Sequence, residues 1–327
     1  MKPRVVVSGC AGWLGRALVA TLRARGCAVV GLDCIAPESA PPCDRFAYLN
    51  LLEGPDAGAP WWDELRGADA FIHCAGYAHR PVETAAEVER FFAINRDGTA
   101  RVVRACEQQG VPKLLYISTI AFYGARQEKA AVEDAPLDPR TAYARSKLDG
   151  EIAVKESALD WRAVRLATLF GTGDKANFAR LASALSRGRF VLPGDATARK
   201  SVMPADLAAE LIAEFALQDQ PRHRLINLGL PRIPTLQEVV AAFVNVCGFP
   251  QPRRLPISLL RTLAAVGDIA ALVRPGFPLT SGNVRKLTQS SAVEVRRMTE
   301  VFPGRTWPDF ATALARHADW YRRPTSA

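Results

Sequence analysis

Short apolar runs alternate with longer amphipathic stretches along the first half of the chain. The apolar runs have the length of strands, are rich in β-branched residues, and cover residues 4–8, 28–33, 71–76 and 113–119. After the first run, Leu14, Leu18 and Leu22 recur at four-residue spacing, which indicates a helix that packs by one face. Strands that alternate with helices from residue 4 to about residue 170 predict an α/β fold, a doubly wound parallel sheet with helices on both faces.

The regular alternation ends near residue 170. Glycines, prolines and short strand-like runs then become irregular, and no internal repeat is visible. We expect residues 1–170 and 200–230 to form the sheet domain, and residues 171–199 and 231–327 to form a smaller C-terminal domain. A chain of 327 residues is long enough to hold two such units.

The most apolar stretch of the second half runs from residue 257 to residue 273. Arg261 and Asp268 interrupt it, and it is shorter than the roughly 20 residues that a membrane-spanning helix needs. We interpret it as amphipathic packing helices and expect no stable membrane insertion. A weak association with a membrane surface stays open as an alternative.

Composition narrows the possible functions. The chain carries a net charge of +9, but its basic residues form no stripe interleaved with aromatics, so we do not expect nucleic acid as a partner. Part of the excess charge suits an anionic ligand. Seven cysteines without paired Cys-x-x-Cys spacing, and four scattered histidines, favour neither a disulfide framework nor a metal site. Because a strand begins within a few residues of the start, we expect no signal peptide and a reducing, cytoplasmic location.

A glycine-rich turn follows the first predicted strand. Gly9, Gly12 and Gly15 lie between that strand and the next helix. Such a turn lets a pyrophosphate approach the backbone, and the helix N-terminus offers free N–H groups and a positive dipole end. The second strand ends at Asp33, where a carboxylate can accept both ribose hydroxyls of an adenosine and repel a 2′-phosphate. The pattern predicts a dinucleotide site that prefers NAD to NADP, and a glycine turn without a ligand is the alternative.

A tyrosine and a lysine stand four residues apart in the segment 141–151. This spacing places Tyr143 and Lys147 on one face of a predicted helix. A nearby cation favours the phenolate and lowers the pKa of a tyrosine, so Tyr143 becomes usable as a base toward an alcohol. A surface helix whose tyrosine and lysine merely share a face would show the same spacing.

Hydroxyl residues end the last of the four strand-like runs. Ser118 and Thr119 stand at the edge where open α/β sheets bind their ligands. They can bond a reacting oxygen there, or they can only satisfy backbone groups at a strand end. The preceding strand ends in small residues at 74–76, and Asn95 lies on the helix that follows it.

Together these residues resemble the extended short-chain dehydrogenase/reductases, in particular the nucleotide-sugar epimerase/dehydratase group, over most of the chain. The resemblance implies a Rossmann-type NAD-binding domain and a smaller C-terminal domain that binds a nucleotide-sugar. It also implies catalytic roles for Tyr143, Lys147 and Thr119, with Ser118 beside them. In that family the hydroxyl and the tyrosine contact the reacting sugar oxygen, while the lysine also holds the nicotinamide ribose.

The resemblance also implies binding residues for both ligands and no metal ligand. For NAD they are Gly9, Gly12, Trp13, Leu14, Gly15, Asp33, Cys34, Asn50, Leu51, Cys74, Ala75, Gly76, Asn95, Ile117, Tyr143 and Lys147. For the nucleotide-sugar they are Tyr77, Thr119, Tyr143, Thr168, Asn177, Phe178 and Arg199. Asn177 and Arg199 are similar to residues that hold the diphosphate, and Arg199 stands seven residues before Asp206, a spacing similar to the family's.

Three departures from the family pattern bear on the reaction. A leucine follows Arg165 where the family has proline, and Lys200 stands where it has an aspartate. Ile120 and Ala121 occupy the positions at which sugar-nucleotide dehydratases carry an acidic pair for the elimination of water. Because neither of these side chains can move a proton, 4,6-dehydration is the lesser alternative.

The expected activity is that of an NAD-dependent oxidoreductase acting at C4 of a nucleotide-sugar, with a UDP-hexose or UDP-N-acetylhexosamine as substrate. The residues fit a 4-epimerase and a reductase of 4-keto sugars equally well. Residues 175–178 and 192–194 resemble bacterial enzymes of surface-polysaccharide biosynthesis. A catalytically silent NAD-binding regulatory protein is the alternative from another class.

Two further expectations concern specificity and assembly. The sugar itself is not readable, because its pocket is expected in the irregular segments 77–82 and 122–127. The segments 87–106 and 143–154 are expected to be helices that flank the sheet. In the resembled family such helices pair across a two-fold axis, so we expect a homodimer.

Overall fold

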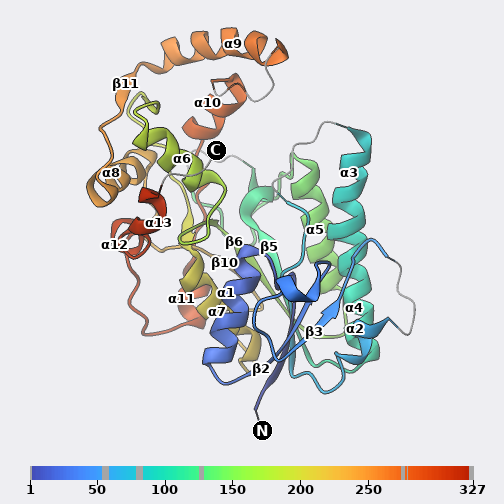
Figure 1. Ribbon diagram of the computed structural model, residues 1–327. Helices are drawn as coiled ribbons and strands as arrows, with labels where there is room; N and C mark the ends of the chain where they lie inside the picture. The colour runs from blue at the N-terminus through green and yellow to red at the C-terminus, as the bar shows by residue number, and fades with distance from the viewer. Residues whose placement is uncertain are drawn as a thin grey trace.

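Seven parallel strands form the centre of the molecule in a computed structural model that describes residues 2–53, 59–78, 84–124, 129–273, 277 and 279–323 (Figure 1). The strands are β1 (Arg4–Ser8), β2 (Ala28–Asp33), β3 (Arg45–Tyr48), β4 (Ala70–His73), β5 (Lys113–Thr119), β6 (Asp160–Leu166) and β10 (Leu225–Leu228). They pair in the order β10-β6-β5-β4-β1-β2-β3, so the predicted doubly wound sheet is confirmed. The direction of winding changes between β1 and β4, where sheets of this kind bind ligands.

Helices cover both faces of the sheet because its strands are apolar on both sides. One face carries α1 (Trp13–Ala24) and α7 (Ala205–Leu217), and the other carries α2 (Pro60–Asp63), α3 (Ala85–Phe92), α4 (Thr99–Gln108) and α5 (Ala142–Lys155) (Figure 1). Val5 and Val7 belong to the apolar cluster on the α1 side, whereas Val6 belongs to the cluster on the α4 side. Alternate residues of a buried strand thus supply both cores.

A π-helical segment, η2 (Ala93–Gly98), joins α3 to α4 in one continuous helical stretch. Gly98 closes the segment against Leu51, since a Cβ on Gly98 would come within 2.8 Å of the Leu51 Cβ. The Thr99 hydroxyl donates to the Asn95 carbonyl oxygen at 2.7 Å. Such π-bulges are frequent at functional sites, and this one buries the Asn95 side chain to 1% exposure.

The second region is mainly helical. It contains α6 (Asn177–Ser186), α8 (Leu236–Cys247), α9 (Ile257–Val273), α10 (Ser281–Thr288), α12 (Phe310–Ala315) and α13 (Ala318–Arg322). Two small sheets pair β7 (Thr168–Phe170) with β9 (Val202–Pro204) and β8 (Val191–Pro193) with β11 (Arg253–Leu255). The rings of Phe170 and Phe310 lie 4.8 Å apart in an apolar cluster that also contains Leu18 of α1, so the two regions share one core. No described helix combines the length and the apolar character needed to cross a membrane.

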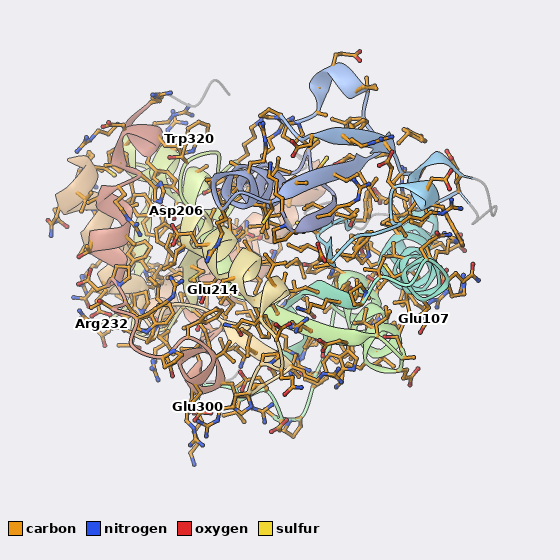
Figure 2. The ribbon with its side chains drawn as sticks, turned by 90° about the horizontal axis from the view of Figure 1, so that it is seen from below. Glu107, Asp206, Glu214, Arg232, Glu300 and Trp320 are labelled. Carbon is orange, nitrogen blue, oxygen red and sulfur yellow. The ribbon has the colours of Figure 1, made fainter. Side chains whose placement is uncertain are left out.

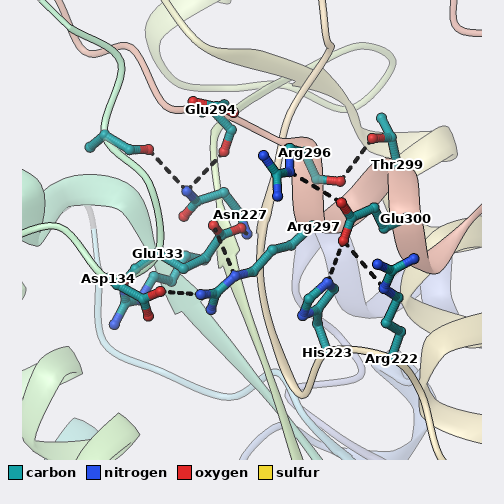
Figure 3. A network of polar contacts seen from close by, with 12 residues as sticks. Glu133, Asp134, Arg222, His223, Asn227, Glu294, Arg296, Arg297, Thr299 and Glu300 are labelled. Atoms are coloured by element: carbon teal, nitrogen blue, oxygen red, sulfur yellow. Dashed lines mark hydrogen bonds and ion pairs between the residues drawn. The ribbon is translucent and has the colours of Figure 1, made fainter.

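Residues 200–230 return largely to the sheet. Here α7 packs on α1, and β10 pairs with β6, while β9 pairs with β7 outside the main sheet. From outside this segment, α11 (Arg296–Val301) also packs against β10, and the division of the chain into two domains stays a prediction. Met298 and Val301 of α11 lie in the same apolar cluster as β10, and next to them the Asn227 side-chain nitrogen donates to the carbonyl oxygens of Ala131 and Glu294, at 3.1 and 3.0 Å (Figure 3). Arg297 pairs with Asp134 and, at 3.7 Å, with Glu133 (Figure 3).

Carboxylates of α7 hold the two regions together (Figure 2). Glu214 accepts a hydrogen bond at 3.2 Å from Arg25, which follows α1, and also pairs with Arg305, which precedes α12. At the other end of α7, the Asp206 carboxylate lies 3.4 Å from the Nε2 atom of His317. These pairs fix α7 against both regions.

Candidate active site

A cavity of about 1200 Å³ lies at the carboxyl ends of β1, β4 and β5 and extends to the second region. Its wall includes Ala11, Trp13 and Arg16 from the glycine turn and α1, and Cys74, Gly76 and Ala78 after β4. It also includes Ile117 to Thr119 at the end of β5, Ile120 and Ala121 after it, and Tyr143 and Lys147 of α5. From the second region come Lys175 to Asn177, Lys200, and Arg285, Lys286 and Gln289 around α10. Residues predicted to bind two different ligands therefore border one space.

The glycine turn leaves the N-terminus of α1 open. Gly9 has φ +69°, and a Cβ there would come within 2.7 Å of the Ala75 backbone. A Cβ on Gly15 would lie 2.8 Å from the Cys10 Cα atom. The helix starts without a side-chain cap or an acidic residue in its first turn, so its N–H groups and dipole favour an anion. The Leu14 side chain is buried, which leaves only its backbone for a ligand.

Asp33 ties the end of β2 to the glycine turn. Its carboxylate accepts hydrogen bonds from the backbone N–H groups of Ala11, at 2.9 Å, and Cys34, at 2.8 Å. The side-chain nitrogen of Asn50 donates to Glu53 at 2.7 Å, and Leu51 is buried. Asp33, Cys34, Asn50 and Leu51 lie outside the described cavity wall, so their contacts with a cofactor stay predictions.

A buried chain of hydrogen bonds runs beneath the ends of β1 and β4. The Ala75 N–H group donates to the Ser8 hydroxyl oxygen at 3.3 Å, and Ser8 lies 2.7 Å from the Nδ1 atom of His73. The His73 Nε2 atom lies 3.1 Å from the Thr99 hydroxyl, whose proton goes to the Asn95 carbonyl. Nε2 must therefore carry the ring proton, and Nδ1 must accept from Ser8.

Burial lowers the pKa of His73 to about 3, with a smaller effect from the nearby ammonium of Lys147. The imidazole therefore stays neutral, and we assign it a structural role in supporting the turn after β4. Sequence analysis did not single out His73 or Ser8. The signal that could have found them is a polar residue inside an otherwise apolar strand end.

Asn95 fixes the loop after β4 against α5. Its side-chain oxygen accepts from the Tyr77 N–H group at 2.8 Å, and its nitrogen donates to the Tyr77 carbonyl and the Ser146 hydroxyl, both at 3.0 Å. A Cβ on Gly76 would lie 3.2 Å from the Asn95 oxygen and 3.8 Å from the Lys147 nitrogen. The Asn95 side chain thus holds the backbone of this loop in place. The Tyr77 ring packs on Phe91 and is not part of the described cavity wall.

Tyr143, Lys147 and Thr119 border the same part of the cavity. The two α5 residues are one helical turn apart, and Thr119 ends β5. The Lys147 ammonium donates to the Ile117 carbonyl oxygen at 2.5 Å and lies 4.0 Å above the centre of the Tyr116 ring. The predicted juxtaposition of hydroxyl, phenol and ammonium is therefore present in the fold.

The pKa values differ from the expectation at Tyr143. Burial raises the pKa of Tyr143 above its ordinary value, although the hydroxyl of Thr119 opposes this by favouring the phenolate. Burial also lowers the pKa of Lys147 to about 7. The predicted lowering of the Tyr143 pKa therefore does not hold for the groups of this chain alone, because desolvation of the phenol outweighs the effect of the Thr119 hydroxyl.

Ser118 has a partner away from the reacting groups. Its hydroxyl donates to the Glu151 carboxylate at 2.6 Å, and that carboxylate pairs with the Arg165 guanidinium at 2.7 Å. All three side chains are buried. Because its proton is committed to Glu151, we assign Ser118 to positioning and keep Thr119 as the catalytic hydroxyl.

The predicted phosphate ligand Arg199 is exposed and lies outside the described cavity wall. The next residue, Lys200, is in the wall instead. Its ammonium donates to the carbonyl oxygens of Lys286 at 2.7 Å and Gln289 at 2.5 Å, and burial lowers its pKa to about 8. This segment therefore brings Lys200 rather than Arg199 to the cavity, because adjacent residues of an extended segment point in opposite directions, and contact of Arg199 with a diphosphate stays a prediction.

Two other predicted substrate residues, Asn177 and Phe178, are neighbours at the start of α6 but face different surroundings. Asn177 is exposed and lines the cavity, as does Thr168 at the start of β7. The ring of Phe178 instead lies in the aromatic core, 5.6 Å from Phe170. The Phe178 ring therefore does not face the cavity, since one face of a helix is buried while its neighbour faces outward, and contact of Phe178 with a substrate stays a prediction.

Seven basic side chains line the cavity wall, and among the described residues the wall contains no aspartate or glutamate. The basic residues are Arg16, Arg140, Lys147, Lys175, Lys200, Arg285 and Lys286. Nothing in the sequence around Arg285 and Lys286 indicates that they line the cavity, because they belong to no local motif. Residues 79–82 and 125–127, where sugar specificity was expected, lie outside the described residues.

Comparison with known proteins places the chain among enzymes. Residues 5–229 match the family model described as "NAD dependent epimerase/dehydratase family". The chain is 27% identical over 284 residues to short-chain dehydrogenase/reductase family 42E member 1 of Xenopus laevis. The matched region covers 79% of this chain and 72% of that protein. It is 30% identical over 213 residues to dTDP-4-dehydrorhamnose reductase of Streptomyces griseus, 65% of each chain.

Solved structures share the fold over nearly the whole chain. The Bordetella bronchiseptica enzyme WbmH in complex with NAD+ is similar with a TM-score of 0.75 and 20% identity, over 98% of this chain and 99% of that chain. MoeE5 in complex with UDP-glucose and NAD gives a TM-score of 0.73 and 21% identity, over 98% of each chain. The chain therefore belongs to the NAD dependent epimerase/dehydratase family and is an NAD-dependent enzyme of the extended short-chain dehydrogenase/reductase class.

Proposed function

We propose that this enzyme oxidises or reduces C4 of a nucleotide-sugar, as a 4-epimerase or a 4-keto reductase. The observation that carries the proposal is the composition of one cavity wall. It joins Thr119, Tyr143 and Lys147 to six further basic side chains and has no described carboxylate. A proton-transfer group and a cationic surface for a diphosphate therefore face the same ligand.

The chain's own residues account for the proton transfer. The Tyr143 phenol takes the proton from the sugar 4-hydroxyl during oxidation and returns it during reduction. Thr119 stabilises the charge that develops on the same oxygen, since its hydroxyl already favours the phenolate. In its protonated form Lys147 places a positive charge beside both groups, and its ammonium is held by the Ile117 carbonyl. Bound NAD supplies the acceptor and donor of hydride.

The cofactor fits the glycine turn. The α1 N-terminus, free of side-chain caps, suits the pyrophosphate, and the close approach of Gly9 to Ala75 leaves room only for backbone. Asp33, beside the turn, suits the adenosine ribose. At the other end of the cavity, Lys200, Arg285 and Lys286 suit a substrate diphosphate. Related structures of the same fold hold NAD with UDP or UDP-glucose, which supports a UDP-sugar here.

A 4,6-dehydratase is the second candidate, since one relative with 26% identity is a dTDP-glucose 4,6-dehydratase. Elimination of water needs an additional acid and base near the sugar. Ile120 and Ala121 stand in the wall next to Thr119, and no described wall residue is acidic. We therefore favour oxidation and reduction at C4. We further propose a role in surface-polysaccharide biosynthesis, because residues 175–178 and 192–194 resemble those of bacterial enzymes in such pathways.

Turnover assays test the proposed reaction. Purified enzyme should interconvert UDP-hexoses or UDP-N-acetylhexosamines without added NADH if it is an epimerase, because the hydride returns to the sugar. Turnover that needs NADH and a 4-keto sugar would identify a reductase. Release of a 4-keto-6-deoxy sugar from a UDP- or dTDP-hexose would refute the proposal in favour of dehydration.

The Arg285→Ala variant should bind UDP about tenfold more weakly or worse, because a hydrogen bond to a charged group contributes about 1.5–3 kcal/mol. Arg199→Ala is the matched control, since Arg199 is the neighbour of Lys200, which lines the cavity, but itself lies outside the described wall. Calorimetric titration with UDP measures both, and NAD affinity should stay unchanged in both. A loss in Arg199→Ala with none in Arg285→Ala would restore the original assignment of Arg199.

The Asp33→Ser variant should gain affinity for NADP relative to NAD by about tenfold or more, because it loses both the ribose acceptor and the charge that repels a 2′-phosphate. Titration of both cofactors measures the change, and Asp44→Asn, at a carboxylate bonded to the Val29 N–H group, is the control. An unchanged preference would remove Asp33 from cofactor selection.

We also propose a homodimer formed through α3 and α5, in which the exposed Ile152 of α5 would be covered. Light scattering at micromolar concentration should give twice the mass of the chain. Ile152→Asp should shift the mass toward the monomer, because a buried unpaired charge weakens an apolar interface. A wild-type monomer would contradict this proposal.

A further inference from the structure

The outer face of α9 is apolar and exposed. Figure 1 shows α9 as the outermost element of the second region, lying across its end above α10. Leu259, Leu263, Val266 and Ile269 are 45%, 41%, 62% and 67% exposed. At 3.6 residues per turn they fall within an arc of about 120°. They make up half of the large apolar side chains exposed in the described chain, so they form a patch rather than isolated residues.

The opposite side of α9 explains how the helix is held. Leu260 and Ala264 are buried, and Gly267 lies so close to the following chain that a Cβ there would be 3.0 Å from the Leu279 carbonyl carbon. The Asp268 carboxylate accepts from the Ser281 N–H group at 2.9 Å. A narrow stripe thus anchors the helix on α10 and leaves its broader apolar face outward. A helix this apolar is ordinarily covered on more than one side.

Charge around α9 indicates what covers it. Residues 251–293 contain six basic residues and one acid, which accounts for five of the chain's net charge of +9. Of the described basic residues here, Arg285 and Lys286 line the cavity, whereas Arg253, Arg254 and Arg261 lie outside its described wall and form no ion pair within the described chain. An apolar helix face beside unpaired cations matches an anionic lipid surface, whose headgroups attract the cations while its acyl boundary accepts the apolar side chains.

We propose that α9 docks this enzyme onto anionic membrane surfaces. The helix lies in the interface, with Leu263, Val266 and Ile269 in the acyl boundary and the neighbouring arginines at the headgroups. Because α10 packs beneath α9 and contributes Arg285 and Lys286 to the cavity wall, docking brings that end of the cavity close to the lipid surface. The proposal does not depend on the reaction at C4.

Vesicle flotation tests the proposal with the full-length enzyme. Wild type should float with vesicles of phosphatidylcholine mixed with phosphatidylglycerol, and much less with phosphatidylcholine alone or at high salt. The triple variant Leu263→Ser, Val266→Ser, Ile269→Ser should lose binding by about tenfold or more. The matched control is Val132→Ser, at a residue that is also 41% exposed but far from α9 in sequence. Thermal unfolding of each variant shows that the fold is kept.

A second variant separates charge from apolar contact. Arg253→Gln, Arg254→Gln, Arg261→Gln should weaken binding to anionic vesicles while leaving the apolar face intact. The proposal would be overturned if the serine variant still bound anionic vesicles, or if the wild-type enzyme did not bind them. So would light scattering in which wild type self-associates through this face and the serine variant does not, because a second copy would then be the occupant.

Discussion

Replacement of Tyr143 by phenylalanine should lower turnover by about 10²-fold or more, the usual scale for the loss of a general acid–base group. The variant removes the one phenolic oxygen in the described cavity wall and leaves Lys147 and Thr119 in place. Because burial raises the pKa of Tyr143, alcohol oxidation by wild type should quicken as pH rises and the phenolate forms. The residual rate of the variant should lack this rise. Steady-state assays across pH measure both effects.

Two controls separate chemistry from folding in that experiment. Cofactor titration should show that Tyr143→Phe binds NAD as wild type does, and Tyr48→Phe, at an exposed tyrosine of β3, should keep wild-type turnover. A Tyr143→Phe enzyme that turns over at the wild-type rate would remove the phenol from the mechanism.

Arg165→Met should destabilise the protein by about 3–5 kcal/mol, because it leaves a buried carboxylate without its cation. The Glu151 carboxylate is buried, and its remaining partner is the Ser118 hydroxyl. Adding Glu151→Gln to Arg165→Met should recover part of the loss, since the amide carries no charge. Chemical denaturation measures the free energy of unfolding for each variant.

The control for this pair is an exposed ion pair of similar composition. Arg296 is 78% exposed and pairs with Glu300 one turn further along α11, so Arg296→Met should cost less than about 0.5 kcal/mol. If the double variant were less stable than Arg165→Met alone, the loss in free energy of unfolding would come from other contacts of the Arg165 side chain rather than from the unpaired charge of Glu151. The Arg165 contacts with Tyr123 and the Glu133 carbonyl would then carry it.

The Glu151–Arg165 ion pair also helps to position the candidate active site. Glu151 lies two turns after Tyr143 on α5, while its partners Ser118 and Arg165 belong to β5 and β6. The network therefore fixes the helix that carries the reacting residues against the strand that carries Thr119. Partial activity loss in Arg165→Met at temperatures where the variant stays folded would be consistent with this positioning role.

Local sequence determined the elements and the chemistry that depend on short-range spacing. The β-branched runs and the leucines of α1 predicted the sheet and its first helix, because periodicities of 2 and 3.6 reflect burial directly. Gly9, Gly12 and Gly15 are needed for close backbone approach, which any fold of this type requires. Tyr143 and Lys147 met in the site because four residues make about one turn of helix.

Tertiary structure alone decided features that depend on distant segments or on burial. Lys200 rather than Arg199 faces the cavity because β-like alternation near Ser291 and Thr235 sets which side chain points inward. Arg285 and Lys286 reach the same wall from about 85 residues further along the chain, so no motif could reveal them. The raised pKa of Tyr143 reflects how deeply the fold buries a phenol whose sequence neighbours predict the opposite shift. Spacing along a helix is local, whereas desolvation and the composition of a cavity wall are properties of the packed chain.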